Sequence, residues 1–457
     1  MNTETIAAIS TAPGESGIGV IRVSGPDAAK IGAKVFVSAG KKPPENRQLT
    51  YGHIKEPETG KVVDEVMCVF LPGPHTYTTE DMLEIYCHGG MVPLRRTLQL
   101  VLACGAVPAG RGEFTKRAFL GGRIDLSQAE AVMDLISAKT DRSFDSAMGQ
   151  LSGVLSQKIG EIRAKFVDVL VDLTVNIDYP DEDIEQITYE KLGAMLEDLI
   201  GDVRQLLSGA DSGRILREGL RVSIVGKPNV GKSSLMNALL RQSRAIVTDI
   251  PGTTRDTIEE SLDLRGIPIV LTDTAGIRNT KDVIEQVGIE RTQKSLEEAD
   301  LVVWMLDSSV PFSEEDQRIL EQIDPAKTLI LLNKTDLTQQ ITIEDVQKKL
   351  PEGAEILETA VNSEESLQKI EDSIERRVNQ GLAPGQSAMI TNARHKGLLE
   401  QTAAALEEAA AAVRMREPLE LIEIDVNEGY LRIGEIIGEE VAGDVLDAVF
   451  ERFCLGK

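Results

Sequence analysis

The sequence predicts a multidomain protein of mixed α/β and α+β class, in which a doubly wound α/β domain is inserted between the two halves of a helical bundle. Three observations support this prediction. The length of 457 residues corresponds to roughly three domains. Near the middle of the chain, an apolar strand-like run is followed by a glycine-bounded loop and a helical pattern. Long helical patterns lie on both sides of that region.

These patterns divide the chain into four segments. We expect an α+β domain over residues 1–118 and the first half of the helical domain over 119–216. The α/β domain is expected over 217–380, and the second half of the helical domain over 381–457. The run Gly381-Leu-Ala-Pro-Gly385 marks the linker into the last segment, because glycine and proline disfavour helix.

The first segment contains short apolar runs bounded by turn residues. Strands are expected at 5–9, 20–23, 66–71 and 82–87, and a helix at 92–104. No catalytic motif can be derived from this stretch alone.

The flanking segments show helical periodicity. Ser127 and Glu130 have the spacing of a capping box before an apolar face. Helices are expected at 162–177, 192–207, 391–415, 419–426, 430–437 and 442–453. The simplest arrangement is one bundle made from two sequence-distant halves.

The stretch from Arg221 to Ser234 predicts a strand, a phosphate-binding loop and a helix. Gly226 and Gly231 allow backbone N–H groups to turn inward around a β-phosphate, and the helix N-terminus adds the positive end of its dipole. Lys232 is expected to reach the β- and γ-phosphates, and the Ser233 hydroxyl to bind Mg²⁺. Taken alone, the loop is also compatible with a glycine-rich turn that binds nothing.

Two further segments follow in the order that a GTPase requires. Thr254 lies in a polar run after the first helix, and we expect its hydroxyl to close onto Mg²⁺ and the γ-phosphate. A strand at 267–273 ends in Asp273, which would hold Mg²⁺ through water. The Gly276 N–H would contact the γ-phosphate.

Buried strands are expected at 301–307 and 328–333, and the second ends in Asn333-Lys-Thr-Asp336. The Asp336 carboxylate can accept hydrogen bonds from N1–H and the 2-amino group of guanine, whereas adenine presents neither donor. The sequence therefore predicts GTP as the nucleotide. The predicted nucleotide contacts are Asn229, Val230, Gly231, Lys232, Ser233, Ser234, Asp273, Thr274, Ala275, Gly276, Asn333, Lys334 and Asp336.

The composition of the sequence bears on the cellular location of the protein and on its cysteine chemistry. The sequence has no apolar N-terminal signal and no run near the roughly 18 apolar residues of a membrane span. Its four cysteines lack CxxC spacing, so we expect neither a disulfide framework nor a zinc site. We expect a cytoplasmic location.

The net charge of −25 opposes a large nucleic-acid footprint. One local exception is a basic stretch in which only Glu113 is acidic. It either meets a phosphate or carboxylate or is a solvated helix face. Its basic residues are Arg111, Lys116, Arg117 and Arg123.

Ile277 stands where Ras-like GTPases place the glutamine that orients the attacking water, and an isoleucine cannot do this. Motifs outside this domain also stand out. They are Gly-Ile-Gly-Val-Ile-Arg22-Val-Ser-Gly, Glu80-Asp-Met-Leu-Glu84-Ile-Tyr-Cys-His88-Gly-Gly, Gly112-Glu-Phe-Thr-Lys-Arg-Ala-Phe, Ile-Asp125-Leu-Ser-Gln-Ala-Glu130-Ala and Phe453-Cys454-Leu-Gly-Lys457. With these motifs the sequence resembles the tRNA-modification GTPase family MnmE, also called TrmE, over the whole chain. The resemblance implies a Ras-like G domain.

The resemblance implies that K⁺ and pairing of G domains activate hydrolysis. The matching K⁺ ligands are Asn229, Thr248, Ile250 and Thr253. A cation there replaces an arginine finger, whose effect is worth roughly 10³ to 10⁵ in rate. The water-orienting acid of the family matches Glu285, which as a bare sequence feature is equally a solvated helix charge. The catalytic set implied is Glu285, Lys232 and Thr254.

The resemblance also implies a folate-binding, dimer-forming N-terminal domain, similar to that of the glycine cleavage T-protein. The matching folate contacts are Arg22, Glu84, Arg123 and Lys457, with ordinary surface ion pairs as the alternative. A pterin offers donors to Glu84, and a glutamyl tail offers carboxylates to Arg or Lys. Two departures from the family pattern are Gly110-Arg111 in place of Arg-Pro, and Gly121-Gly122-Arg123 in place of Asn-x-Lys.

The implied reaction adds an aminomethyl or carboxymethylaminomethyl group to the wobble uridine of tRNA. The carbon comes from 5,10-methylenetetrahydrofolate, for which 5-formyltetrahydrofolate is an analogue. The implied partners are a second copy of the chain, the FAD-dependent protein MnmG in a heterotetramer or larger complex, and tRNA held largely by MnmG. Cys454 is implied in modification, with a buried structural cysteine as the alternative.

A second interpretation assigns the chain to regulatory switch GTPases, such as those of ribosome assembly, with flanking domains that only bind partners. The G domain is common to both interpretations. A folate-dependent one-carbon activity of the N-terminal domain would separate them.

Overall fold

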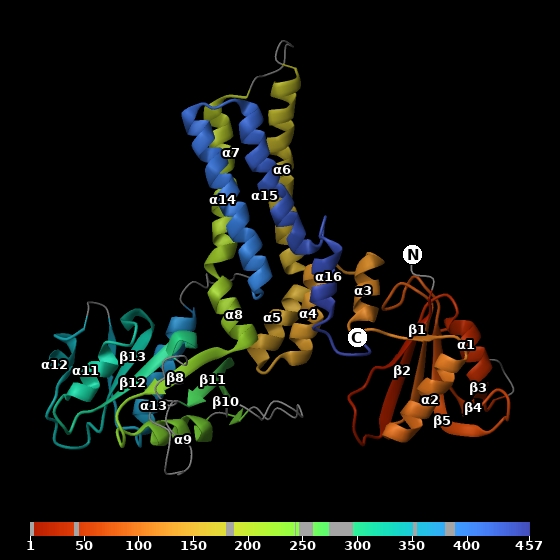
Figure 1. Cartoon of the computed structure of the whole chain (residues 1–457), viewed down its shortest axis with the longest axis horizontal. Coiled ribbons are helices and arrows are strands. Elements are labelled where there is room, and N and C mark those ends of the chain that lie inside the picture. Colours follow the sequence, from red (N-terminus) through yellow and green to blue (C-terminus); the bar gives the residue numbers. More distant parts are fainter. Residues whose placement is uncertain are drawn as a thin grey trace. The chain divides into compact units, whose positions relative to one another are not determined.

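The computed structural model describes residues 4–40, 45–179, 187–242, 244–245, 259–273, 296–350, 354–379 and 389–457. The chain divides into two compact units (Figure 1). The first unit comprises Met1–Met133 and Ile433–Lys457, and the second comprises Asp134–Arg432.

The first unit is built on a seven-stranded sheet with strand order β3-β4-β5-β6-β2-β1-β7. Helices α1 (Ala28–Val35) and α2 (Met91–Ala103) pack their apolar faces on it. The register of β2 and β6 places Arg22 directly opposite Glu84. The strands predicted in this region are confirmed, as is the helix at 92–104. The strands are β1 (Ile6–Ile9), β2 (Ile18–Ser24), β3 (Phe36–Ser38), β4 (Thr50–Lys55), β5 (Val62–Leu71), β6 (Met82–His88) and β7 (Val107–Pro108).

Three further helices belong wholly or mostly to the first unit. They are α3 (Glu113–Leu120), α4 (Leu126–Ser137) and α16 (Gly443–Phe450). Leu126 and Ala129 of α4 form a buried cluster with Phe450 and Phe453 from the other end of the chain. Segments far apart in sequence therefore share one apolar core.

The predicted capping box of α4 is wrong by two residues. The Asp125 carboxylate accepts from the Gln128 N–H at 2.9 Å, and the Gln128 side chain accepts from the Asp125 N–H at 3.0 Å. This is the reciprocal pattern of a capping box, but it starts at Asp125 because the helix begins at Leu126. Ser127 and Glu130 lie inside the helix and are buried.

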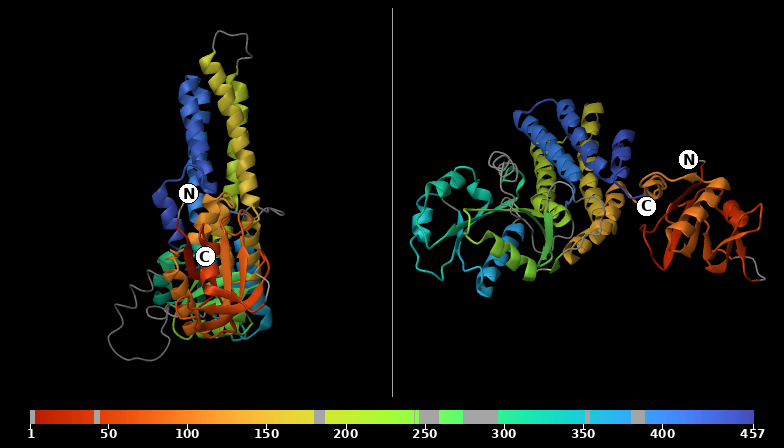
Figure 2. Two further views of the ribbon diagram at one scale, coloured as in Figure 1. Left: turned by 90° about the vertical axis from the view of Figure 1, so that its right-hand side faces the viewer. Right: turned by 60° about the horizontal axis from the view of Figure 1, so that its bottom comes forward.

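In the second unit, four long helices lie side by side: α6 (Val154–Asp178), α7 (Tyr189–Ser208), α14 (Ala393–Met415) and α15 (Leu419–Ile437) (Figure 1, Figure 2). Helix α7 packs along both α6 and α14. Tyr189 donates a hydrogen bond to the Glu417 carbonyl, which ties the two sequence halves together. The bundle continues into α5 (Asp141–Leu151) and α8 (Ala210–Glu218).

The two helices predicted at 419–426 and 430–437 are one continuous helix, α15. Gly429 does not interrupt it. A Cβ at this position would lie 3.1 Å from the ring of Phe166, which is fully buried on α6. The glycine therefore permits close packing of two helices. In the sequence alone, it wrongly predicted the end of one helix and the start of another.

The second sheet has strand order β14-β13-β12-β8-β11-β10-β9. Strands β14 to β11 are parallel to their neighbours, whereas β10 and β9 are antiparallel. Two buried clusters contain alternate residues of the central strands, as expected for a sheet covered on both faces. The predicted strands at 267–273, 301–307 and 328–333 are confirmed. The strands are β8 (Leu220–Val225), β9 (Arg244–Ala245), β10 (Glu259–Leu264), β11 (Ile267–Asp273), β12 (Leu301–Asp307), β13 (Thr328–Asn333) and β14 (Glu355–Glu358).

The helices around this sheet are α9 (Lys232–Gln242), α11 (Glu314–Leu320), α12 (Ile343–Gln347) and α13 (Glu364–Asn379), with a short 3₁₀ turn at Pro325–Lys327. Within the described ranges, none of the helices is long and apolar enough to span a membrane.

Candidate functional sites

The predicted phosphate loop connects β8 to α9, at the carboxyl edge of the parallel strands. Asn229 adopts a left-handed conformation with φ of 64°. Gly231 has φ of 112°, and a Cβ there would lie 2.5 Å from Nδ2 of Asn333. Only glycine fits this approach, which holds the loop against the end of β13.

Lys232 points its ammonium group back into the loop. Its Nζ donates to the carbonyl oxygens of Gly226 and Lys227, the latter at 2.8 Å. Ser233 is exposed at the start of α9, as is Asn229 in the loop. The loop thus presents one cation and two exposed oxygen-bearing side chains at a helix N-terminus, which suits a phosphate and its metal ion.

Lys227 anchors the loop from the other side. Its Nζ lies 2.6 Å from Oδ2 of Asp316 and 3.1 Å from Oγ of Ser313. Asp316 is buried and also closes the capping box of α11. The motif alone did not identify this anchor, because the loop position of Lys227 tolerates most residues.

The Asn333 amide connects three loops at the predicted base-binding end. Its Nδ2 donates to the Val230 carbonyl at 2.7 Å, and its Oδ1 accepts from the Val361 N–H at 3.2 Å. Thr359 Oγ1 lies 3.4 Å from the same oxygen. Asn333 therefore sets the distance between the phosphate loop and the segment after β14. It acts as a structural link here.

Lys334, with φ of 64°, places its Nζ 2.6 Å from Oδ2 of Asp307 at the end of β12. Burial opposes the charge on Asp307, but hydrogen bonds from Lys334 and Ser309 outweigh it and lower the pKa of the carboxyl group. Asp336 is exposed, and its carboxylate makes no hydrogen bond with the described part of the chain. Its predicted contact with a guanine base stays a prediction.

Several predicted site residues lie outside the described residues. Asp273 ends β11 and pairs in register with Ile224 of β8, which places its backbone near the start of the phosphate loop. Its side chain lies outside the described part of the structure. The predicted residues outside the described ranges are Thr248, Ile250, Thr253, Thr254, Thr274, Ala275, Gly276 and Glu285, together with Ile277.

The predicted folate contacts gather around two aromatic rings in the first unit. Arg22 and Glu84 form a largely buried ion pair at 3.0 Å. The Arg22 guanidinium lies 5.3 Å from the ring centre of Tyr77 and 5.8 Å from that of Phe114. The second oxygen of Glu84 accepts from the Tyr86 hydroxyl at 2.8 Å. Burial, followed by this bond, raises the pKa of Tyr86 to about 12.

Arg123 and Lys457 share the same neighbours. The Arg123 guanidinium lies 4.8 Å from the Tyr77 ring centre, and its Nη1 donates to the Tyr77 carbonyl. The Lys457 carbonyl accepts from the Phe114 N–H at 3.2 Å. Cys454 is exposed, so the alternative that it is a buried structural cysteine is wrong.

Comparison of the sequence with known proteins shows the family to which the chain is related. A family profile described as the GTP-binding protein TrmE N-terminus matches residues 5–123, and one described as the MnmE helical domain matches residues 126–454. Curated relatives named tRNA modification GTPase MnmE match end to end. The relative from Alkaliphilus oremlandii is 48% identical, covering 99% of each chain. Those from Geobacillus kaustophilus and Clostridioides difficile are 47% and 46% identical, again covering 99% of each chain.

The chain belongs to the MnmE family of tRNA-modification GTPases.

The MnmE helical-domain profile extends across the second sheet, which the structure places between α8 and α13 in chain order. Residues that the family motifs did not single out also shape this part of the chain. Asp307 holds Lys334, and Val361 holds Asn333. The available sequence signal for Val361 is its position just after a fifth parallel strand, β14.

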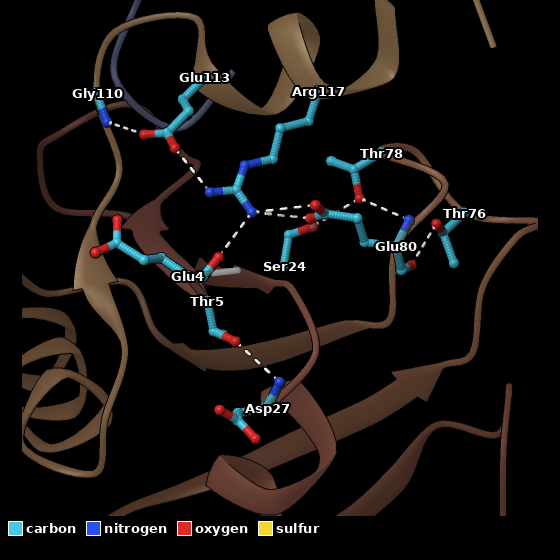
Figure 3. A network of polar contacts seen from close by, with 10 residues as sticks. All are labelled: Glu4, Thr5, Ser24, Asp27, Thr76, Thr78, Glu80, Gly110, Glu113 and Arg117. Carbon is cyan, nitrogen blue, oxygen red and sulfur yellow. Dashed lines mark hydrogen bonds and ion pairs between the residues drawn. The ribbon is translucent and has the colours of Figure 1, made fainter. Parts of the chain in front are cut away.

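Two of the four basic residues in the stretch 111–123 are already paired with carboxylates of the chain. Arg117 is buried and bonded to Glu80 and Glu113 (Figure 3). Lys116 pairs with Asp447 at 2.5 Å. For these two residues the alternative of meeting a carboxylate is therefore confirmed, and that of a solvated helix face is wrong for the buried Arg117.

Proposed function

We propose that this protein binds and hydrolyses GTP to GDP and phosphate, and that hydrolysis serves the modification of the wobble uridine in tRNA. The observation that carries the proposal is the joint placement of Lys232, Asn333 and Asp336 at one edge of a parallel sheet, in a chain of the MnmE family. An aminomethyl or carboxymethylaminomethyl group is the product modification.

The described residues fit a guanine nucleotide. Gly231 leaves room where a Cβ would collide with Asn333, and Asp336 offers both carboxylate oxygens to N1–H and the 2-amino group of guanine. Lys232 would exchange its bonds to the loop carbonyls for the β- and γ-phosphates. Ser233 and Thr254 would hold Mg²⁺, and Asp273 would hold it through water. When bound, Mg²⁺ supplies positive charge where the phosphates develop negative charge.

K⁺ is the proposed activator. Asn229 fits this assignment because its amide is exposed on a left-handed turn of the phosphate loop. Thr248, Ile250 and Thr253 would complete the set of oxygen ligands, and Glu285 would orient the attacking water. G domains of two copies would pair during hydrolysis.

The first unit is proposed to bind 5,10-methylenetetrahydrofolate as the one-carbon donor. The half-buried Tyr77 offers a ring face for a pterin, and Arg22, Arg123 and Lys457 offer positive charge for the glutamyl tail. Both oxygens of Glu84 already accept hydrogen bonds, so a pterin donor would share Glu84 with Arg22 and Tyr86. The exposed Cys454 lies in the segment that pairs with this region.

The proposed assembly is a homodimer with an FAD-dependent partner, MnmG, in the cytoplasm. The net charge of −25 supports a division of labour in which the partner holds most of the tRNA. The proposed domains are 1–118 for folate binding and dimerisation, 217–380 for GTP, and 119–216 with 381–457 for the helical domain.

GTP turnover by the full chain in potassium against sodium, at equal ionic strength, tests the proposal. Turnover is expected to rise at least tenfold in potassium, and Asn229→Ala is expected to remove that rise. Asn427→Ala, on the exposed face of α15, is the matched control and should behave as wild type. Equal rates in the two salts would reject the Asn229 assignment and favour a regulatory switch GTPase.

A further inference from the structure

Arg117 stands at the centre of a buried polar network in the first unit (Figure 3). Its Nη1 donates to Glu80 at 3.0 Å and to the Glu4 carbonyl at 3.0 Å, and its Nη2 donates to Glu113 at 2.8 Å. Its side chain is only 4% exposed. Both terminal nitrogens are therefore engaged inside the protein, and Arg117 is not placed to bind a ligand itself.

The Glu80 arm of this network holds the segment between β5 and β6. Glu80 accepts from Ser24 at 2.7 Å, and Thr78 bonds the same serine at 2.6 Å. Thr76 donates to the Glu80 carbonyl at 2.6 Å, which closes the segment on itself. This segment carries Tyr77, the ring that both Arg22 and Arg123 face.

The Glu113 arm holds the entry to α3. The second oxygen of Glu113 accepts from the Gly110 N–H at 2.6 Å, which fixes the turn over residues 110–113. The next residue, Phe114, supplies the second ring beside Arg22. The two carboxylates that Arg117 joins therefore belong to the two segments that frame Arg22.

The same turn receives the C-terminal tail, residues 451–457. Arg111 and Leu455 form an antiparallel bridge, and the Gly112 and Phe114 N–H groups donate to the Cys454 and Lys457 carbonyls. The tail also passes close to β1, since a Cβ at Gly456 would lie 2.2 Å from the Ile9 carbonyl oxygen. With φ of 85°, Gly456 fixes the path by which Lys457 reaches Phe114.

We propose that Arg117 is a positioning residue that joins the Tyr77 segment to the Phe114 turn and the C-terminal tail, and so sets the shape of the site around Arg22. The buried guanidinium suits this work because its planar fork bonds two carboxylates and a carbonyl in fixed directions, which a lysine cannot reproduce. The inference rests on the proposed folate binding of the first unit.

The test uses Arg117→Lys in the full chain, with 5-formyltetrahydrofolate as the binding probe. We expect its dissociation constant to rise about tenfold, in line with the loss of one charge-assisted bond. Amide hydrogen exchange should accelerate in residues 110–114 and 451–457, whereas GTP turnover should not change. The matched control is Arg96→Lys, because the ion pair of Arg96 with Glu56, at 3.6 Å, lies on the surface.

If Arg117→Lys does not fold, two other variants test the proposal, each of which weakens only one of the two ion pairs of Arg117. Glu113→Gln should accelerate exchange in the tail, and Glu80→Gln should accelerate it in residues 72–81. Unchanged exchange and affinity in folded Arg117→Lys, or in both of these other variants, would overturn the proposal. Failure of the wild type to bind 5-formyltetrahydrofolate would instead reject the folate assignment, and the exchange rates would still show whether Arg117 joins the two segments.

Discussion

At the scale of single residues, the ion pair between Asp307 and Lys334 has a consequence for stability. Asp307 is buried, and its replacement by asparagine leaves the Lys334 ammonium without its partner carboxylate. We expect Asp307→Asn to lower the free energy of unfolding by about 1–3 kcal/mol at neutral pH. Urea unfolding followed by fluorescence of Trp304, the only tryptophan, measures this directly because Trp304 lies in the same strand.

The loss should depend on pH in a defined direction. Because folding lowers the pKa of Asp307, its contribution is present above the ordinary carboxyl pKa of about 4 and disappears as the pH falls through the lower, folded value. Wild type and variant should therefore converge in acid. A difference that persists unchanged there would show that the stabilisation does not come from the charge.

The four cysteines should differ in reactivity. Burial raises the pKa of Cys68 and of Cys87 to about 12, so neither forms a thiolate near neutral pH. Cys454 is exposed. Alkylation of the native protein at pH 8, read by mass spectrometry, should label Cys454 at least tenfold faster than Cys68 or Cys87, and denaturation should abolish the difference.

Local motifs singled out the residues that we propose to meet a ligand, but not those that hold them. Asp336 was recognisable because its place in Asn333-Lys-Thr-Asp336 is fixed by the base that it is proposed to read, whereas Asn333 links loops within the chain. Asp307 and Val361 reach the same site through strand order, which no single stretch encodes. Arg117 was assigned to a basic patch because its partner Glu80 lies 37 positions away.

At the scale of elements, replacing either of two glycines in the bundle by alanine should change stability in opposite directions. Gly160 lies inside α6, where an added Cβ would meet open space, so Gly160→Ala should stabilise the protein by about 0.5–1 kcal/mol through helix propensity. Gly429→Ala should destabilise it by about 1 kcal/mol or more, because the new methyl group meets Phe166. Thermal unfolding by far-UV circular dichroism compares them. Equal shifts would contradict the packing explanation.

Element boundaries also show the limits of the sequence pattern. Helical periodicity predicted α6, α7 and α14 because their apolar faces repeat over several turns. It divided α15 at Gly429, where tertiary packing outweighs local propensity. It also placed the cap of α4 at Ser127, although Asp125 is an equally good capping residue.

At the scale of the molecule, the first turn of α5 connects the bundle to the second sheet within the second unit. Thr140 donates to the Gly266 carbonyl at 2.8 Å, in the turn between β10 and β11, and Arg142 donates to Asn379 at the end of α13. Strand β11 runs from this turn to Asp273, a predicted nucleotide residue about 20 Å away along the strand. Displacement at Asp273 would thus be passed to α5.

We expect Arg142→Ala to leave GTP turnover within about twofold while tRNA modification falls about fivefold or more, as for the loss of a typical coupling between sites. Parallel assays of phosphate release and modified uridine measure the two effects. Thr174→Ala, whose hydroxyl bonds Glu423 within the bundle, is the control. Equal loss of both activities would mean that Arg142 only supports the fold.

The first unit is built from both ends of the chain, and this affects its folding during translation. One of its apolar clusters combines Leu126 and Ala129 with Phe450 and Phe453, and the whole second unit is translated between them. While the nascent chain emerges, the apolar face of α4 stays uncovered until the C-terminal segment has been made. Exposed surface of this kind favours aggregation. Slow translation through the second unit should therefore increase the dependence of this protein on chaperones.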